Sequence, residues 1–287
     1  MYWLLLILPG FMILLLLAIH LGFRPPRNVE SGSPSDLGID FTCVNIPTVR
    51  GKRLFAWLLP SIPQAPVIII LHGWGGNAEL MLPVARPFLK TGMNVLLVDS
   101  RNHGGSDSDS FSSLPRFAED AGCAVDWIKS HFNNPSQEIV LLGHSVGAGA
   151  VLLEASRRDD ISAVISISAF AHPEWMMRRY LERLHLPPPL LSGILRYVEW
   201  VIGHRFEQIA PVNTLGKIKC PVLLVHGMAD NTVPVSDAQA LSRAADIDLL
   251  LVDDAGHDSV DKIEEHGDQL IHFLLQAELF PGRVNIE

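Results

Sequence analysis

The chain has 287 residues, and 48% of them are hydrophobic, which suits one sizeable α/β domain with a full core. Its formal net charge of −9 at pH 7 and its scattered lysines and arginines exclude a nucleic-acid partner, because phosphate binding needs a concentrated basic surface. The three cysteines, Cys43, Cys123 and Cys220, lie far apart and form no CxxC pair, so they indicate neither a disulfide framework nor a metal site.

The first segment, from Tyr2 to Phe23, is almost wholly apolar. As a helix it would extend roughly 33 Å, close to the thickness of the hydrocarbon core of a bilayer. We therefore predict a single-pass transmembrane anchor over residues 1–23. A secretory signal, cleaved or uncleaved, is the alternative. A cleavable one would have a basic side chain before the segment and an A-x-A-like site after it, and the sequence has neither. Arg24 and Arg27 come directly after it, which predicts a membrane protein with a cytoplasmic catalytic domain.

Residues 24–38 are rich in proline, serine and glycine and have no apolar periodicity, which predicts a linker of limited order. The folded domain is expected to span residues 39–287. It opens with two apolar stretches, Phe41–Thr48 and Leu54–Leu59, that have no helical pattern between them. We expect these two stretches to form an antiparallel hairpin at one edge of a sheet.

Short apolar, β-branched runs then alternate with longer stretches of helical spacing. The runs are residues 67–71, 94–98, 138–142, 163–168, 222–225 and 248–252. Continuous apolar strands that alternate with helices are typical of a parallel sheet covered on both faces. The sequence therefore predicts an α/β fold with a mostly parallel, eight-stranded sheet.

One long insertion interrupts this alternation, between the run at 163–168 and the run at 222–225. It has helical stretches, a break at Pro187–Pro189 and large apolar residues such as Trp175, Met176 and Trp200. A connection of this length is unusual in a compact domain. We predict a helical lid over the site at about residues 170–215; extra helices that only pack on the domain are the alternative.

The stretch GHSVG places Ser145 between two glycines, directly after an apolar strand and before a run of small residues. A sharp turn from strand to helix forces such a serine into a strained backbone conformation and exposes its hydroxyl. In an open parallel sheet, ligands bind beyond the carboxyl ends of the strands, where Ser145 is predicted to lie. Ser145 is therefore the candidate nucleophile, and Val146 after it offers a backbone N–H to an oxyanion.

A serine hydroxyl needs a base, and the base needs a carboxylate to orient it. His257 follows the last apolar run, and Asp230 follows the run before it. Asp253, Asp254 and Asp258 are rivals for the acid because they flank His257. His103 also follows a strand, but as the base it would break the order of serine, acid and histidine in the chain.

The motifs GHSVG, HGMADNTVP and AGH occur in the order of the α/β-hydrolase superfamily, and the sequence resembles that superfamily over about residues 40–277. It is most similar to the lidded carboxylesterase, lipase and serine-aminopeptidase-like members. The stretch ILHGWGGN resembles the family's oxyanion loop, which implies that the backbone N–H of Trp74 is the second oxyanion donor. The resemblance implies no cofactor.

We therefore expect a carboxylic ester hydrolase with the triad Ser145, Asp230 and His257. Trp74, His144, Trp175 and Met176 are the expected substrate-binding residues, with a small-molecule or lipid ester as substrate. A pocket narrowed by Trp74 would favour short- to medium-chain acyl groups.

The alternatives are a thioesterase or a peptidase with the same triad, or a catalytically silent membrane scaffold. Glu174 or Glu182 in the lid would hold the amino terminus of a peptide. The sequence predicts no oligomeric state.

Overall fold

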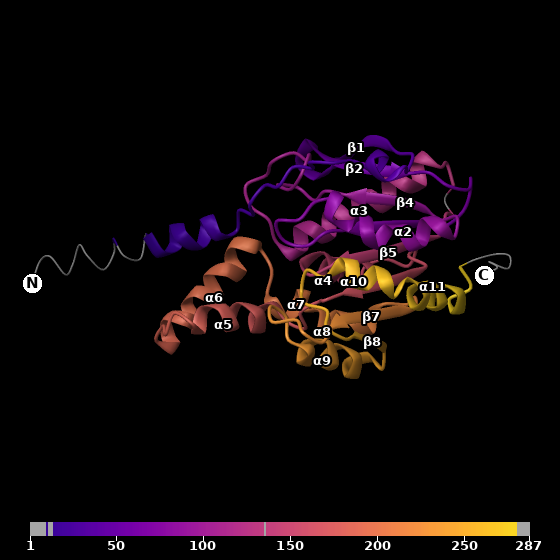
Figure 1. The fold of residues 1–287 in the computed structure, drawn as a ribbon. Helices are drawn as coiled ribbons and strands as arrows, with labels where there is room; N and C mark the ends of the chain where they lie inside the picture. The colour runs from indigo at the N-terminus through magenta and orange to yellow at the C-terminus, as the bar shows by residue number, and fades with distance from the viewer. Residues whose placement is uncertain (1–9, 11–13, 135, 280–287) are drawn as a thin grey trace, which may run out of the picture.

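The computed structural model describes residues 10, 14–134 and 136–279, which form a sheet covered by helices on both faces (Figure 1). The strands are β1 Thr42–Thr48, β2 Lys52–Leu59, β3 Val67–Leu71, β4 Asn94–Val98, β5 Ile139–His144, β6 Ala163–Ile167, β7 Val222–Gly227 and β8 Asp248–Val252. The helices that cover the sheet are α2 Leu82–Lys90, α3 Leu114–His131, α4 Val146–Ala155, α9 Val235–Ala245, α10 Val260–Glu265 and α11 Gly267–Gln276. Short 3-10 turns occur at η1 Pro34–Leu37, η2 Val49–Gly51, η3 Glu79–Met81 and η4 Leu215–Lys217.

The eight strands lie in the order β1-β2-β4-β3-β5-β6-β7-β8. The pairs β1–β2 and β2–β4 are antiparallel, and all the other pairs are parallel. The predicted eight-stranded, mostly parallel sheet and its edge hairpin are thus confirmed. In the pairing of β3 with β5, Leu71 lies opposite Gly143, so the loops that follow these two strands leave the sheet side by side.

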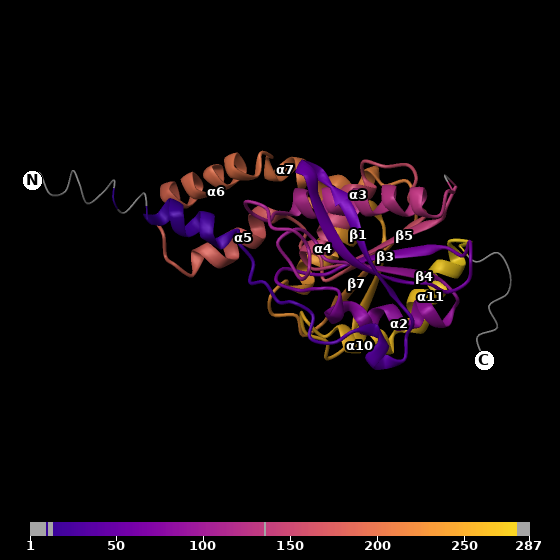
Figure 2. The same cartoon turned by 90° about the horizontal axis from the view of Figure 1, so that it is seen from above.

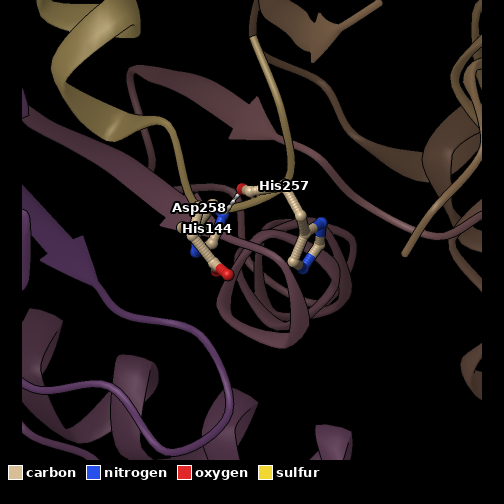
Figure 3. A group of neighbouring side chains, drawn as sticks. All are labelled: His144, His257 and Asp258. Carbon is tan, nitrogen blue, oxygen red and sulfur yellow. Dashed lines mark hydrogen bonds between the residues drawn. The ribbon is translucent and has the colours of Figure 1, made fainter. Parts of the chain in front are cut away.

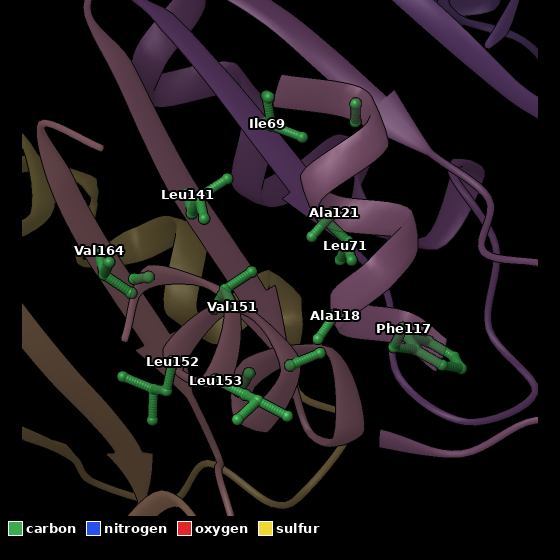
Figure 4. Packing of buried hydrophobic residues seen from close by; sticks show 14 of the residues in the cluster. Ile69, Leu71, Phe117, Ala118, Ala121, Leu141, Val151, Leu152, Leu153 and Val164 are labelled. Atoms are coloured by element: carbon green, nitrogen blue, oxygen red, sulfur yellow. The ribbon is translucent and has the colours of Figure 1, made fainter. Parts of the chain in front are cut away.

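The core has two halves, one on each face of the sheet, because successive residues of a strand point to opposite faces. In β3, Ile69 and Leu71 belong to the half beneath α3 and α4, whereas Ile68 and Ile70 belong to the half beneath α2 and α11. Figure 4 shows the first half, in which Ile69 and Leu71 lie close to side chains of α3 and α4. Burial on both faces explains why the strand sequences are apolar throughout rather than alternating.

The insertion after β6 forms helices α5 Pro173–Glu182, α6 Pro188–Ile202, α7 Phe206–Ile209 and α8 Pro211–Thr214. In both views α5 and α6 project from one end of the molecule, and α11 lies toward the other (Figure 2). The break between α5 and α6 falls at Pro187, because three consecutive prolines cannot continue a helix but can begin one.

Residues 14–22 form a helix, termed here the N-terminal helix, that lies beside α5 and α6 (Figure 1; Figure 2). The first part of the anchor predicted over residues 1–23 lies outside the described residues. Within residues 10, 14–134 and 136–279, no helix is both long and apolar enough to cross a bilayer.

Residues 24–38, predicted to be a linker of limited order, make defined hydrogen bonds to the folded domain. The guanidinium of Arg27 donates to the carbonyls of Gly104 (3.2 Å) and Ser106 (2.8 Å). Asn28 donates to the carbonyl of Gly75 at 2.8 Å, and the backbone N–H of Ser31 donates to Glu79. Hydrogen bonds from polar side chains and backbone groups fix this segment on the domain. Such bonds need no apolar periodicity, so the sequence pattern did not indicate that the segment is ordered.

Glu30 in this segment lies beside Asp99, which is fully buried at the end of β4. One carboxylate oxygen of Glu30 is buried and has no hydrogen-bond donor among the described residues. A proton on the carboxyl group of Asp99 would supply a hydrogen bond to this oxygen. Burial first, and then the neighbouring Glu30, raise the pKa of Asp99 to about 8.

This carboxyl pair makes the stability of the fold depend on pH. The pKa of Asp99 is higher in the folded protein than its ordinary value of 3.8, so its contribution to the free energy of unfolding is lost as the pH rises toward about 8. In Glu30→Gln the amide would donate to Asp99 without a shared proton. We expect its melting temperature to fall less between pH 6 and pH 9 than that of the wild type, measured by circular dichroism. Glu207→Gln, at an exposed side chain, is the control, and equal slopes in all three proteins would contradict the assignment.

Candidate active site

Ser145 lies at the turn between β5 and α4, with a φ of 55° and a ψ of −117°. This left-handed conformation is strained for a residue with a side chain, and it lifts the hydroxyl away from the strand. A side chain at Gly143 would collide with the backbone of Gly147, and one at Gly147 would collide with the carbonyls of Leu71 and His72. The two glycines are therefore required by the close approach of the backbone around the serine.

His257 and Asp230 reach Ser145 from the loops after β8 and β7. The Nε2 atom of His257 lies 2.9 Å from the hydroxyl oxygen of Ser145, and its Nδ1 atom lies 2.7 Å from a carboxylate oxygen of Asp230. These two hydrogen bonds join residues that are 112 and 27 positions apart in the chain. The structure therefore brings the three predicted residues together in the geometry of a nucleophile, a base and an orienting acid.

The surroundings of Asp230 keep it ionised. Its burial opposes the charge, but hydrogen bonds from His257 and from the backbone N–H groups of Val233 and Thr232 hold its pKa below the ordinary value. The two backbone bonds, both 2.8 Å long, occupy one carboxylate oxygen and leave the other for His257. An anion in this position favours the tautomer of His257 that carries its proton on Nδ1 and accepts at Nε2.

The side chain of His144 contacts the backbone of His257. Its Nε2 atom lies 2.7 Å from the backbone carbonyl oxygen of His257 and donates to it, as Figure 3 shows. Burial, together with the nearby His257, lowers the pKa of His144 to about 4, so its ring is neutral at pH 7. His144, His257 and Asp258 offer atoms close enough to hold a metal ion. However, both ring nitrogens of His257 are already bonded to Asp230 and Ser145, so a metal ion here would compete with the triad.

The two predicted oxyanion donors flank the nucleophile. Val146 is the first residue of α4, where the backbone N–H has no partner within the helix. Trp74 lies in the loop after β3, and both residues line the same cavity as Ser145. A negative oxygen beside Ser145 would be stabilised by the positive end of α4, which begins at Val146.

A cavity of about 830 Å³ opens in front of Ser145. This volume lies in the upper part of the usual range for ligand pockets. Lid residues that line it are Phe170, Pro173, Met176, Met177, Tyr180, Leu181, Ile194, Val198, Ile202, Phe206 and Ile209. The cavity therefore offers a mainly apolar space next to a reactive serine.

Comparison with known proteins agrees with this geometry. The sequence profile of the family described as "Serine aminopeptidase, S33" matches residues 63–216, which is more than half of the chain. The chain belongs to this family. The matched range runs from before β3 to the end of the lid and includes the nucleophile turn.

Several relatives share most of the length of this S33-family chain. The uncharacterized protein YfhR of Escherichia coli (strain K12) is 26% identical over 275 residues, covering 91% of this chain and 88% of that protein. The Pyrococcus furiosus esterase Pf2001 superposes with a TM-score of 0.70 at 26% identity, covering 88% of this chain and 98% of that one. Est1E of Butyrivibrio proteoclasticus, with ferulic acid bound, shares the fold at a TM-score of 0.65 and 24% identity, covering 81% of this chain and 99% of that one.

Within this S33-family site, the predicted substrate-binding residues have different positions. Trp74, His144 and Met176 line the cavity, but Trp175 does not. The ring of Trp175 stacks on His172 at 5.5 Å, and 42% of the residue is exposed. Successive helical residues differ by about 100° in direction. When Met176 faces the cavity, Trp175 therefore turns toward the outside of α5.

The lid glutamates are also outside the cavity. Glu174 lies 2.7 Å from the guanidinium of Arg178 in the same helix, and neither Glu174 nor Glu182 is among the lining residues. His103, the other candidate base, packs against His72 and Phe117 and does not itself line the cavity.

Sequence analysis missed one part of the site. Ile19, Gly22 and Phe23 line the cavity, although they belong to the segment predicted to be a membrane anchor. A uniformly apolar segment has no polar face, so its sequence pattern does not reveal which side faces a protein.

Proposed function

We propose that this protein is a carboxylic ester hydrolase that works through an acyl-enzyme on Ser145. The observation that carries the proposal is the pair of hydrogen bonds from His257 to Ser145 and to Asp230, at 2.9 Å and 2.7 Å. The likeness to the Pyrococcus furiosus esterase supports an ester as the substrate. No cofactor takes part in this chemistry.

In the proposed reaction, His257 accepts the proton of Ser145 as the hydroxyl oxygen attacks the ester carbonyl. The N–H groups of Val146 and Trp74 stabilise the oxyanion of the tetrahedral intermediate. The intermediate expels the alcohol, which takes the proton from His257. Water then attacks the acyl-enzyme, with His257 again as the base, and releases the acid and free Ser145.

A peptidase and a thioesterase are the alternatives with the same triad. The family is described as a serine aminopeptidase, and an aminopeptidase needs an acidic group to hold the amino terminus of its substrate. Glu174 and Glu182, the lid residues suggested for that role, do not line the cavity. The lid therefore offers no acidic group for the amino terminus of a peptide, and Asp258 beside His257 is the acidic residue that lines the cavity. The intact triad also argues against a silent scaffold.

The acyl group that the enzyme accepts depends on the room in the cavity. The preference for short- to medium-chain esters was predicted from a pocket narrowed by Trp74. The cavity volume of about 830 Å³ and the apolar lining from the insertion give room for acyl chains longer than eight carbons, beyond the range predicted from the sequence.

A panel of substrates that the same triad could hydrolyse distinguishes an esterase from a peptidase and a thioesterase. We expect kcat/KM for p-nitrophenyl octanoate to exceed that for an aminoacyl p-nitroanilide by at least about 100-fold. The matched octanoyl thioester is measured beside them. Hydrolysis of the anilide alone would identify a peptidase, and preference for the thioester would identify a thioesterase.

We also propose that residues 1–23 attach the protein to a membrane, with the catalytic domain on the cytoplasmic side. The apolar sequence from Tyr2 to Phe23 and the arginines that follow it support this placement. Recovery of the full chain in membranes after a high-salt wash tests the proposal, and release by salt would refute it.

A further inference from the structure

One face of the N-terminal helix packs against the lid. Leu15, Ile19 and Phe23 are spaced four residues apart, so they share one side of the helix. They contact the lid cluster, a set of buried residues from α6 and α7 made up of Leu191, Ile194, Leu195, Val198 and Phe206. On the other side, Leu14, Leu17 and Leu21 are each at least half exposed. The N-terminal helix thus has one defined inner face, and this face is turned toward the lid.

The inner face also reaches the cavity in front of Ser145. Ile19, Gly22 and Phe23 line it together with Ile194 and Val198 of α6. Polar lining groups come from other parts of the cavity wall, such as Ser145, His257 and Thr232. The side chains that the N-terminal helix and α6 contribute to the wall are all apolar, so this part of the cavity suits a hydrocarbon chain and not a charged or hydrogen-bonding group.

Resting on the proposed ester hydrolysis, we propose that the N-terminal helix is a wall of the acyl-binding pocket and that Ile19, Gly22 and Phe23 set the acyl-chain length the enzyme accepts. The substrate class is then an ester of an unbranched acyl chain, long enough to extend from Ser145 to the N-terminal helix. Each methylene that enters the apolar space increases the buried area, so kcat/KM rises with chain length until the chain meets this wall.

Gly22 offers a direct test, because it lacks a side chain at the wall. Among the described residues, a Cβ atom added there would meet nothing within 4 Å, so a larger side chain would begin in open space. Gly193 in α6 is the matched control. It is also a helical glycine with nothing within 4 Å of an added Cβ, and it does not line the cavity.

The experiment measures kcat/KM of the full chain for p-nitrophenyl esters from acetate to palmitate. For the wild type we expect kcat/KM to rise beyond eight carbons. In Gly22→Leu the optimum should move to shorter chains. The ratio of the dodecanoate value to the acetate value should fall by at least about tenfold, because the four carbons of the new side chain exclude at least about two methylenes of the acyl chain from the cavity. In Gly193→Leu this ratio should equal that of the wild type.

A second variant tests the same wall in the opposite direction. Ile19→Ala removes side-chain volume, so the optimum should move to longer chains. If the wild type hydrolyses these esters but both variants keep its chain-length profile, the wall is assigned wrongly while the proposed function stands. If the wild type hydrolyses none of the esters, the proposed function itself fails. A shift in Gly193→Leu as large as that in Gly22→Leu would also overturn the inference.

Discussion

Ser145→Ala should lower kcat for ester hydrolysis on the order of a millionfold, the effect seen when a triad serine is removed from another hydrolase. The loss is large because alanine has no oxygen to attack the carbonyl and no covalent intermediate can form. Alanine keeps the Cβ atom, so the strained φ of 55° is the same in the variant and the fold should be unaffected. Steady-state kinetics with p-nitrophenyl butyrate and thermal unfolding measure the two quantities.

Ser166→Ala provides the matched control. Ser166 is a buried serine in the neighbouring strand β6, and its hydroxyl has no hydrogen-bond partner within the described residues. Its replacement should leave kcat within about twofold of the wild type. The same two proteins can be compared with a fluorophosphonate probe, which should label the control but not Ser145→Ala. Substantial esterase activity in Ser145→Ala would exclude Ser145 as the nucleophile.

Asp230→Asn should lower kcat by about 10⁴-fold through the tautomer of His257. One oxygen at this position accepts hydrogen bonds from the backbone of Thr232 and Val233, and only the oxygen of asparagine can replace it. The amide nitrogen must then face Nδ1 of His257 and donate to it. His257 would carry its proton on Nε2, where it could no longer accept the proton of Ser145.

The rival carboxylates near His257 give the controls for this variant. Asp253 lies in the same loop as His257 and is exposed, so Asp253→Asn should leave kcat within about threefold of the wild type. If Asp253→Asn rather than Asp230→Asn abolished activity, the acid would be misassigned. Thermal unfolding of both variants separates a loss of catalysis from a loss of fold.

The sequence by itself determined the sheet and the order of the three proposed triad residues, Ser145, Asp230 and His257, at the ends of its strands. Strands buried on both faces must be continuously apolar, so residues 67–71 and 94–98 could be assigned from their composition alone. The nucleophile turn was predictable for a similar reason. Only glycines tolerate the backbone contacts on either side of Ser145, and this requirement appears directly in the local sequence.

The side of a lid helix that meets the cavity was less predictable. Trp175 and Met176 are adjacent and both apolar, yet only Met176 lines the cavity. The choice depends on how α5 is rotated on the domain, which is set by packing with residues far along the chain. The pair formed by Arg179 of α5 and Asp237 of α9, at 2.8 Å, is one such contact.

Only the tertiary structure decided the roles of the N-terminal helix and of residues 24–38. Their contacts join distant positions, as in the hydrogen bond between Arg27 and Ser106, which lie 79 residues apart. A uniformly apolar helix and a segment rich in proline and serine have no periodicity that identifies a partner. Their places in the fold depend on surfaces that exist only once the sheet and the helices of the insertion have formed. For this reason the position of Ile19, Gly22 and Phe23 in the cavity wall is visible in the structure but could not be predicted from the sequence.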